Sequence, residues 1–407
     1  MSSVDPRTVL FYLDRLEMGG VERVTLNLLQ GLKQSGWSPI LALNTAKGEL
    51  LGDVSPGIPI FDLQAQHLPG AVRSLHDALE ESKAGILFSA RAYLNTIAML
   101  ACIHTPAKLV LAEHTLLTKW WKDERMPKRR ADQVIRLTLP LVSRMADAVV
   151  GVSQGVVQDL ARACRLPPEK IHLCYNPILP AAIESMAQTA LPFRSDRPVV
   201  LAIGRMSQEK GFDLLLEAFR RLETPAHLVL VGDGPELPRL RALAEGLSGN
   251  SANSENSKNS VTFAGTQRNP FPWIERSNVL ALSSLIESFP TVLIEAMARG
   301  KPVVAFDCPV GPREIIRHEG NGLLVPPRDP AALARALDRV LSDSVLAARL
   351  GEAGRADAKA FGFGETVQAY EALFHSLFEK RGSHEHPRNH EPVDDGRSGA
   401  VRRSIVE

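Results

Sequence analysis

Short runs of apolar residues alternate with longer stretches of amphipathic helical spacing along almost the whole chain. A strand that is apolar on both faces must be covered on both faces, which is the condition of a parallel sheet between layers of helices. In the first half, the predicted strands are Val9–Leu13, Ile40–Leu43, Ile86–Phe88, Leu109–Ala112 and Ala148–Val152. This half therefore predicts one α/β domain with a parallel sheet.

The same alternation starts again in the second half. Its predicted strands are Pro198–Ile203, Leu228–Val231, Thr262–Ala264, Val279–Leu282 and Pro302–Ala305. The proline-containing segment Leu179–Arg197 lies between the two series and is the predicted linker. We therefore expect a first domain at 1–180, a second at 181–378 and a polar, disordered tail at 379–407.

Charge and composition exclude several classes of protein. The 47 Lys and Arg residues balance 46 Asp and Glu residues, so no nucleic-acid-binding surface is implied for the chain as a whole. No run approaches the roughly 18 apolar residues of a membrane span, and the first apolar run is too short for a signal peptide. We expect a cytoplasmic protein whose membrane contact, at the inner face of the plasma membrane, is peripheral.

Two acidic residues flank the start of a predicted helix in the second half, in the segment Glu287-Ser-Phe-Pro-Thr-Val-Leu-Ile-Glu295. Pro290 suits a first helical turn, and Gly300 suits the end, so the predicted helix runs from Pro290 to Arg299 with Ser288 as N-cap. The free amides of a helix start bind anions such as phosphate. Carboxylates beside such a site can bind sugar hydroxyls. The alternative is that Glu287 is a solvated residue of the loop and Glu295 a solvated residue on the helix surface.

Two further loops follow predicted strands, and such loops hold ligands at the carboxyl edge of an α/β sheet. The first, Gly204-Arg205-Met-Ser-Gln-Glu-Lys210-Gly211, offers two cations to a diphosphate, unless these are ordinary exposed charges. The second, around Asp233, has glycines on both sides that let a base or ribose approach the backbone, unless it is simply a turn.

Together these segments resemble the retaining glycosyltransferases of family 4, whose fold is called GT-B, over roughly residues 7–375. The resemblance implies an α/β protein of two Rossmann-like parallel-sheet domains facing a central cleft. It further implies that Arg205 and Lys210 hold the donor diphosphate, that Glu295 binds the ribose and that Glu287 binds the transferred sugar. The backbone amides of Phe289, Thr291 and Val292 would contact sugar and phosphate.

The first half carries two segments at predicted strand ends. Gly19-Gly20-Val-Glu-Arg23 permits close backbone approach at a helix start, and it resembles the GG-x-E-R turn of many family members, which faces the donor and acceptor. It is not the G-x-G-x-x-G pattern of nicotinamide enzymes. His114, after Leu109–Ala112, is similar to the E-H-x segment of members with lipid-linked acceptors, and would contact the sugar or manage protons. A tight turn and a structural histidine are the alternatives.

A third segment of the first half is strongly cationic and aromatic. Tryptophan beside Lys and Arg is typical of a segment near anionic headgroups, and the cations suit an acceptor pyrophosphate; a solvated loop is the alternative. The residues concerned are Lys119, Trp120, Trp121, Lys122, Arg125, Lys128, Arg129 and Arg130.

The sequence thus predicts a hexosyltransferase that moves a hexose or N-acetylhexosamine from a nucleotide diphosphate donor, UDP-linked by family resemblance. The acceptor would be a glycan linked to a polyprenyl diphosphate in envelope polysaccharide assembly. The chain has no Asp-x-Asp, so we expect no metal and no cofactor beyond the donor itself. Two alternatives remain open: a nucleotide-sugar epimerase on the same fold, and a non-catalytic sugar- or nucleotide-binding module.

Overall fold

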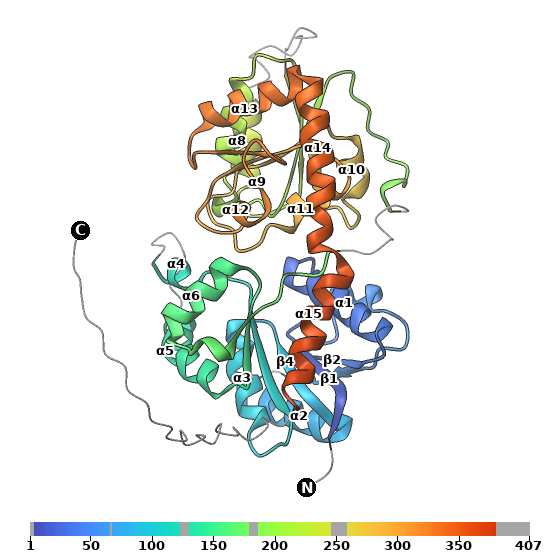
Figure 1. Ribbon diagram of the computed structural model, residues 1–407, viewed down its shortest axis with the longest axis vertical. Coiled ribbons are helices and arrows are strands. Elements are labelled where there is room, and N and C mark those ends of the chain that lie inside the picture. Colours follow the sequence, from blue (N-terminus) through green and yellow to red (C-terminus); the bar gives the residue numbers. More distant parts are fainter. Residues whose placement is uncertain (1–3, 66, 123–129, 179–185, 246–258, 380–407) are drawn as a thin grey trace, which may run out of the picture.

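The computed structural model describes residues 4–65, 67–122, 130–178, 186–245 and 259–379; the side chains of residues 120–122 and 130–132 lie outside this description. The described chain forms two α/β domains that lie end to end (Figure 1). Each is built on one sheet, and the strands within each sheet pair parallel.

The N-terminal sheet has the strand order β3-β2-β1-β4-β5-β6-β7. Its strands are β1 (Asp5–Leu13), β2 (Ser38–Leu43), β3 (Ile60–Asp62), β4 (Ala84–Ser89), β5 (Lys108–Glu113), β6 (Ala148–Gly151) and β7 (Ile171–Leu173). The helices of this half are α1 (Gly20–Gln34), α2 (Leu68–Ser82), α3 (Ala92–Cys102), α4 (Leu117–Lys122), α5 (Arg130–Met145) and α6 (Gln154–Cys164).

The C-terminal sheet has the order β10-β9-β8-β11-β12-β13. Its strands are β8 (Val199–Ile203), β9 (His227–Val231), β10 (Ser260–Gly265), β11 (Val279–Leu282), β12 (Val303–Phe306) and β13 (Leu323–Val325). The helices that follow in this half are α8 (Phe212–Arg220), α9 (Leu237–Glu245), α10 (Phe271–Arg276), α11 (Thr291–Ala298), α12 (Pro312–Ile315), α13 (Pro330–Ser342), α14 (Ser344–Ala358) and α15 (Phe363–Ser376).

Both sheets have a topological switch point, where successive connections leave in opposite directions. In the first sheet this point lies between β1 and β4, and in the second between β8 and β11. Ligands of open α/β sheets bind beyond the carboxyl ends of the strands at such points. The topology therefore marks one candidate ligand position in each domain.

The predicted α/β architecture and the predicted central strands are confirmed. Their apolar runs are buried because both faces of each sheet are covered by helices. Three strands were not predicted, namely β3, β7 and β13, and each has only three residues. Segments this short acquire strand structure from pairing with a neighbour, which periodicity within the segment cannot reveal.

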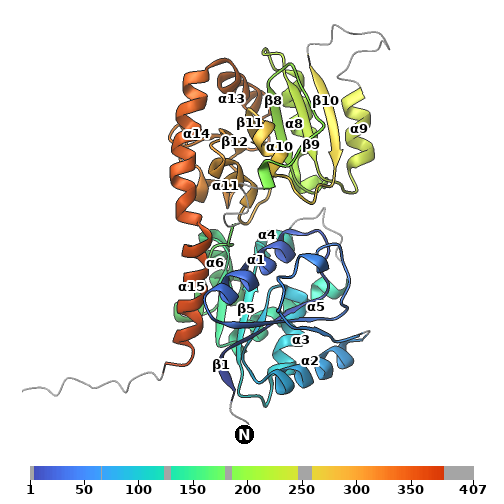
Figure 2. The ribbon, with the colours of Figure 1, turned by 90° about the vertical axis from the view of Figure 1, so that its right-hand side faces the viewer.

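The last helix crosses from one domain to the other, which differs from the expected division of the chain. α15 falls in the expected second domain, 181–378, yet it packs against α1 of the first. Its side chains Tyr370 and Phe374 are buried in the same core as β1 and β4. Figure 2 shows α14 and α15 running along one side of both domains. The expected tail, 379–407, lies outside the described residues apart from Glu379.

Candidate functional site

The loops that follow β8 and β9 pack directly against each other at the carboxyl edge of the second sheet. The amide of Met206 donates to the carbonyl of Asp233 at 2.8 Å. Gly232 has a φ of +133°, and a Cβ at this position would collide with the carbonyl oxygen of Gly204. Glycine is therefore required here for a steric reason, and the Asp233 turn lies beside the Arg205 loop, at the sheet edge where both were expected.

Lys210 and Glu287 form an ion pair across the switch point of the second sheet. Lys210 Nζ donates to Glu287 Oε1 at 2.6 Å, and the Glu287 side chain is 10% exposed. Burial alone would lower the pKa of Lys210, but the Glu287 carboxylate reverses this, so that the pKa lies above its ordinary value. The lysine is therefore charged at neutral pH. Its backbone is held by Ser283, whose hydroxyl donates to the Lys210 carbonyl at 3.0 Å.

Arg205 lies on the same loop as Lys210 but has a different environment. Its side chain is exposed. Among the described residues, none pairs with its guanidinium group by a hydrogen bond or a salt bridge. A phosphate arriving at this edge would therefore meet one cation that is already paired and one that is available.

Helix α11 begins beside this ion pair. The first-turn amides of Thr291 and Val292 have no preceding helical turn to supply acceptors, so they can face an anion. The helix has nearly the predicted bounds, but the predicted N-cap is wrong: Pro290, not Ser288, occupies the N-cap position. Pro290 accordingly offers no side-chain acceptor to these amides.

Glu295 lies on the second turn of α11 and faces the N-terminal domain. Burial raises the pKa of Glu295, while the Arg23 guanidinium and a hydrogen bond with Thr291 oppose this rise. Arg23 comes from the first turn of α1, and it also donates to the carbonyl of Arg268 at 3.1 Å. The Gly19–Arg23 turn therefore lies near α11, across the domain boundary.

A second ion pair lies at the switch point of the first sheet. Glu22, in the first turn of α1, pairs with Arg91, which directly precedes α3 after β4. Glu22 is 5% exposed, and its second oxygen, Oε2, is buried with no hydrogen-bond partner in the described structure. Oε2 occupies the space that a Cβ on Gly19 would need, so this glycine admits the carboxylate.

Neither Glu22 nor Arg91 was singled out as a site residue from the sequence. Glu22 stands inside the Gly19–Arg23 segment, and an acidic residue at a helix start within a predicted ligand-binding turn is a signal that could have found it. Arg91 has no motif around it. Only the adjacency of β1 and β4 brings it to Glu22.

His114 lies just beyond the end of β5, in the edge region that also holds Arg91. Burial, and next the positive charge of Arg91, lower the pKa of His114 to about 4. The imidazole is therefore neutral near pH 7, and it can exchange hydrogen bonds with a hydroxyl but supplies no positive charge. The preceding Glu113 is also buried; its Oε1 accepts from Asn95 Nδ2 at 2.7 Å, and burial raises its pKa to about 8.

The cationic segment is described only in part. Lys119, in α4, is partly buried, and burial lowers its pKa while Cys308 of the other domain and Asp159 oppose this. Lys119 therefore approaches the second domain near the site. The remaining residues of the segment lie outside the described residues or have side chains outside the description, so their proposed roles stay predictions: Trp120, Trp121, Lys122, Arg125, Lys128, Arg129 and Arg130.

Two further contacts join the domains near the site. Tyr175, after β7, stacks on Phe289 at a centroid distance of 4.9 Å and an interplanar angle of 26°. Glu314 of α12 accepts from the amides of Gln154 and Gly155, at 2.8 and 3.0 Å, at the start of α6. The carboxylate of one domain thus caps a helix of the other, where the helix dipole favours negative charge.

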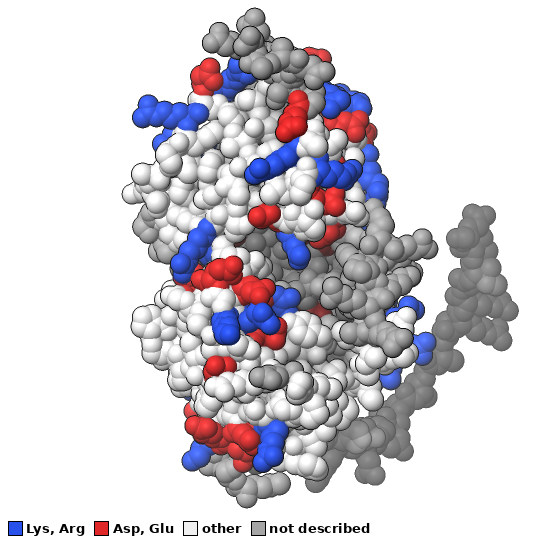
Figure 3. Space-filling model, turned by 180° about the vertical axis from the view of Figure 1, so that it is seen from behind, with Lys and Arg blue, Asp and Glu red and all other residues white. Residues whose placement is uncertain are grey.

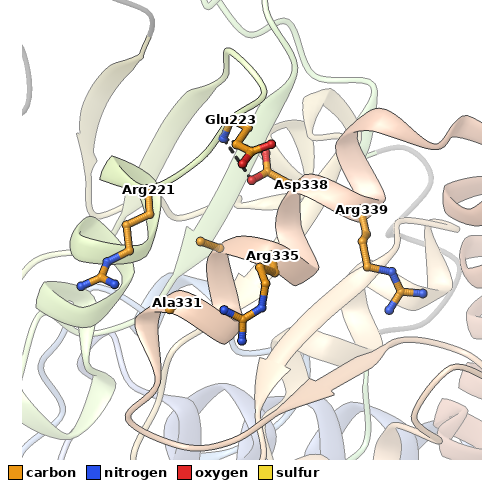
Figure 4. A pocket seen from close by; sticks show the side chains of 7 residues that line it. Arg221, Glu223, Ala331, Arg335, Asp338 and Arg339 are labelled. Atoms are coloured by element: carbon orange, nitrogen blue, oxygen red, sulfur yellow. Dashed lines mark hydrogen bonds between the residues drawn. The ribbon is translucent and has the colours of Figure 1, made fainter.

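The outer surface offers fewer candidates. A pocket between α8 and α13 is lined by Arg221, Arg335 and Arg339 together with Glu223 and Asp338 (Figure 4). Most of these charges have partners: Arg221 pairs with Glu217, Arg339 pairs with Glu319, and Asp338 accepts backbone amides. A second pocket, acidic in character, is lined by Glu17, Met18, Gly48 and Glu49. On the face seen in Figure 3, acidic and basic side chains lie beside each other where the two domains meet, with no large field of one sign.

Within the described ranges, no group of three or more His, Cys, Asp and Glu side chains gathers in a way that could hold a metal ion. In the same ranges, no helix has both the length and the apolar character needed to cross a bilayer.

Two α/β domains, each built on one parallel sheet, are typical of the GT-B class, and sequence comparison agrees. Residues 18–181 match the family model described as Glycosyltransferase Family 4, and residues 197–343 match the model described as Glycosyl transferases group 1. Together the two matches span most of the chain. The chain therefore carries a Glycosyltransferase Family 4 domain followed by a Glycosyl transferases group 1 domain.

Similar proteins include an exopolysaccharide phosphotransferase of Streptomyces coelicolor, 37% identical over 182 residues that make up 44% of this chain and 18% of that protein. An N-acetylgalactosamine-N,N'-diacetylbacillosaminyl-diphospho-undecaprenol 4-alpha-N-acetylgalactosaminyltransferase of Campylobacter jejuni is 29% identical over 56% of this chain and 60% of its own length. Each match therefore spans less than two thirds of the curated relative. Anabaena HepE, solved with UDP and glucose, superposes with a TM-score of 0.74 at 20% identity, over 91% of this chain and 99% of HepE, which shows the common fold.

Proposed function

We propose that this protein is a retaining, metal-independent glycosyltransferase that transfers a hexose or N-acetylhexosamine from UDP to a lipid-linked glycan. The observation that carries the proposal is the Lys210–Glu287 ion pair over the switch point, between the Arg205 loop and the start of α11. A nucleotide sugar bound there would meet cations and helix amides at its diphosphate and a carboxylate at its sugar.

The charge on the departing UDP would be stabilised by the protein itself. Arg205, Lys210 and the first amides of α11 form the positive surroundings of the diphosphate. Glu287, held by Lys210, would accept hydrogen bonds from sugar hydroxyls. Glu295, whose pKa is raised by burial, would gain hydroxyl donors from the ribose.

The anomeric configuration of the sugar is retained if the acceptor attacks the anomeric carbon from the same face that UDP leaves. The acceptor oxygen forms a bond to the anomeric carbon while the bond from that carbon to the β-phosphate oxygen breaks, and the electron pair stays with UDP. The acceptor proton passes to the leaving phosphate, so no protein base is required. Neutral His114 and the Gly19–Gly20 turn, both at the N-terminal edge of the domain boundary, would position the sugar.

The proposed acceptor is supported by the charge of the cationic segment and by the name of one relative. The name of the Campylobacter relative describes an acceptor linked to diphospho-undecaprenol. The cationic segment that starts at Lys119 suits such a diphosphate, and its tryptophans suit the headgroup region of a membrane. We therefore propose a cytoplasmic protein that associates peripherally with the inner face of the plasma membrane in the assembly of envelope polysaccharide.

The test is calorimetry with UDP, GDP, ADP and NAD on the wild type and on Lys210→Ala, together with transfer assays from UDP-sugars. We expect the wild type to bind UDP tightly and the other three nucleotides weakly. In Lys210→Ala, transfer should fall by about 10²–10³-fold, because one fixed cation at the leaving group is removed. Transfer should survive EDTA.

A matched control is Lys108→Ala, which breaks an exposed Lys–Asp pair at 3.1 Å at the opposite end of β5. It should bind UDP and transfer sugar like the wild type. Unchanged transfer in Lys210→Ala would refute the diphosphate assignment. Activity lost in EDTA and restored by Mg²⁺ would refute the metal-free reaction, and UDP binding without transfer to any acceptor would favour a binding module.

A further inference from the structure

Helix α5 carries an apolar stripe on its exposed side. Val134, Leu137, Leu141 and Met145 are 58%, 80%, 60% and 52% exposed. Their spacings of three, four and four residues place them on one face of the helix. This helix alone holds four of the 11 exposed large hydrophobic side chains of the described chain.

The stripe is not a poorly packed part of the core. The opposite face of α5 carries Leu139 and Val142, both buried, as is Ala146 directly after the helix, and α5 packs against α3 and α6. The fold of the domain is therefore complete without the stripe. Single exposed apolar residues need no explanation, but an aligned row on one helix marks a contact surface.

The charges beside the stripe indicate what covers it. From Gln133 to Met145, the charged residues of the helix are two exposed arginines, Arg136 and Arg144. The nearest acidic residues are Asp132, in the first turn of α5, and Asp147, two residues beyond its end, which pairs with Lys108 at 3.1 Å. At its end, Lys170 donates to the carbonyl oxygens of Arg144 and Ala146 at 2.5 and 2.9 Å. An apolar row with cations at its border matches a surface that is apolar inside and anionic outside, which describes an anionic bilayer.

A second copy of the chain fits this face less well. A two-fold contact through α5 would place the same patch against itself and bring arginines toward arginines. Figure 1 shows α4, α5 and α6 on one flank of the N-terminal domain. The His114 loop leads into α4 and α5, so a membrane on this flank would lie on the acceptor side of the molecule.

We propose that α5 lies in the interface of an anionic membrane, with Val134, Leu137, Leu141 and Met145 inserted among the lipids. This inference rests on the proposed function, since it specifies the surface by which the enzyme reaches a lipid-linked acceptor. It adds that described, already folded residues form the contact, in addition to the tryptophans of the cationic segment.

The experiment is flotation of the full chain with phosphatidylcholine vesicles, with and without phosphatidylglycerol. The variants are Leu137→Glu/Leu141→Glu and the control Val345→Glu, which changes an equally exposed side chain (77%) on α14 of the other domain. We expect the wild type and the control to bind the anionic vesicles. The partition coefficient of the double variant should be lower by about tenfold or more, because two leucines that would insert into the lipid are replaced by charged side chains. Its affinity for UDP should be unchanged, which shows that the fold is intact.

Three outcomes would overturn the proposal in distinguishable ways. If the wild type binds and the double variant binds equally, the stripe is not the contact, although membrane association stands. If the wild type binds no vesicle, the membrane association of the proposed function fails too. If sedimentation velocity shows a wild-type dimer that the double variant dissociates, the stripe is an interface between two copies of the chain.

Discussion

At the residue scale, the same kind of ion pair occurs once in each domain. An acidic and a basic side chain pair across the switch point of each sheet: Glu287 with Lys210, and Glu22 with Arg91. In both pairs, the partners come from loops that leave the central strands in opposite directions. Each pair ties two loops together at the place where a ligand would sit, and a carboxylate held by a cation keeps a defined orientation.

Glu113 gives a prediction about pH. Its carboxyl group is protonated in the folded chain up to a pKa of about 8, whereas it ionises from about 4.5 when unfolded. The wild type should therefore lose stability as pH rises from about 5 to 8. Glu113→Gln keeps the acceptor for Asn95 and removes the charge, so it should be more stable than the wild type by a few kcal/mol at pH 8.5. Urea unfolding across this pH range measures the difference.

The difference between Glu113→Gln and the wild type should vanish near pH 4.5, where the folded side chains are both neutral. Glu80→Gln, on α2, serves as the control, because this side chain is exposed and its replacement should not have an effect that grows with pH. A stability difference that is constant between pH 5 and 8.5 would contradict the protonated, buried state of Glu113.

At the element scale, helix starts act as binding points. α11 has its first amides at the carboxyl edge of the second sheet, and α6 donates its first amides to Glu314 of the other domain. A Cβ on Gly155 would collide with Val310 of the other domain, so a side chain here would push the domains apart. The same property of helices thus suits an anion at the start of α11 and holds the two domains together at the start of α6.

We expect Glu314→Gln to weaken the closed arrangement, because a neutral amide binds a helix start less strongly than a carboxylate and accepts at only one oxygen. The apparent KM for the donor should rise severalfold with little change in kcat. Small-angle scattering with UDP present should show a larger radius of gyration. Glu352→Gln, exposed on α14, is the control. An unchanged radius together with an unchanged KM would refute the role of Glu314.

At the scale of the whole molecule, the chain ends its fold in the domain where it began. α15 returns to the N-terminal domain and completes its core, with Phe374 in ring contact with Trp37 at 5.5 Å and with Phe88 at 6.2 Å. The Trp37 indole also donates to Glu371 at 3.1 Å. Each domain is therefore linked to the other by the chain twice, once before β8 and once between α14 and α15.

Phe374→Ala should destabilise the N-terminal domain by about 3–5 kcal/mol, because it removes a fully buried ring from a packed core. Urea unfolding followed by near-UV circular dichroism should show an earlier transition for this domain. Val345→Ala, at a position that is 77% exposed, should shift it by less than about 0.5 kcal/mol. A single transition at the wild-type midpoint would mean that α15 is not part of the domain's cooperative core.

The sequence by itself determined the architecture and most of the candidate site at the carboxyl edge of the second sheet. Apolar runs between helices require covered parallel sheets, and residues that directly follow such strands must lie at one edge. That rule alone predicts that Arg205, Lys210 and Glu287 lie near one another. Pro290 and Gly300 predicted the bounds of α11 to within one residue. The predicted N-cap, Ser288, was wrong, because capping depends on the exact path of the loop before the helix.

Only the tertiary structure decided which loops meet. Glu22 and Arg91 are 69 positions apart along the chain, and Glu314 caps α6 from 160 positions beyond Gln154. No local pattern encodes such contacts, since they depend on strand order and on domain closure. The exposed stripe of α5 has the same origin: periodicity shows that a helix has apolar residues, but only packing shows which of them the core leaves to the outside.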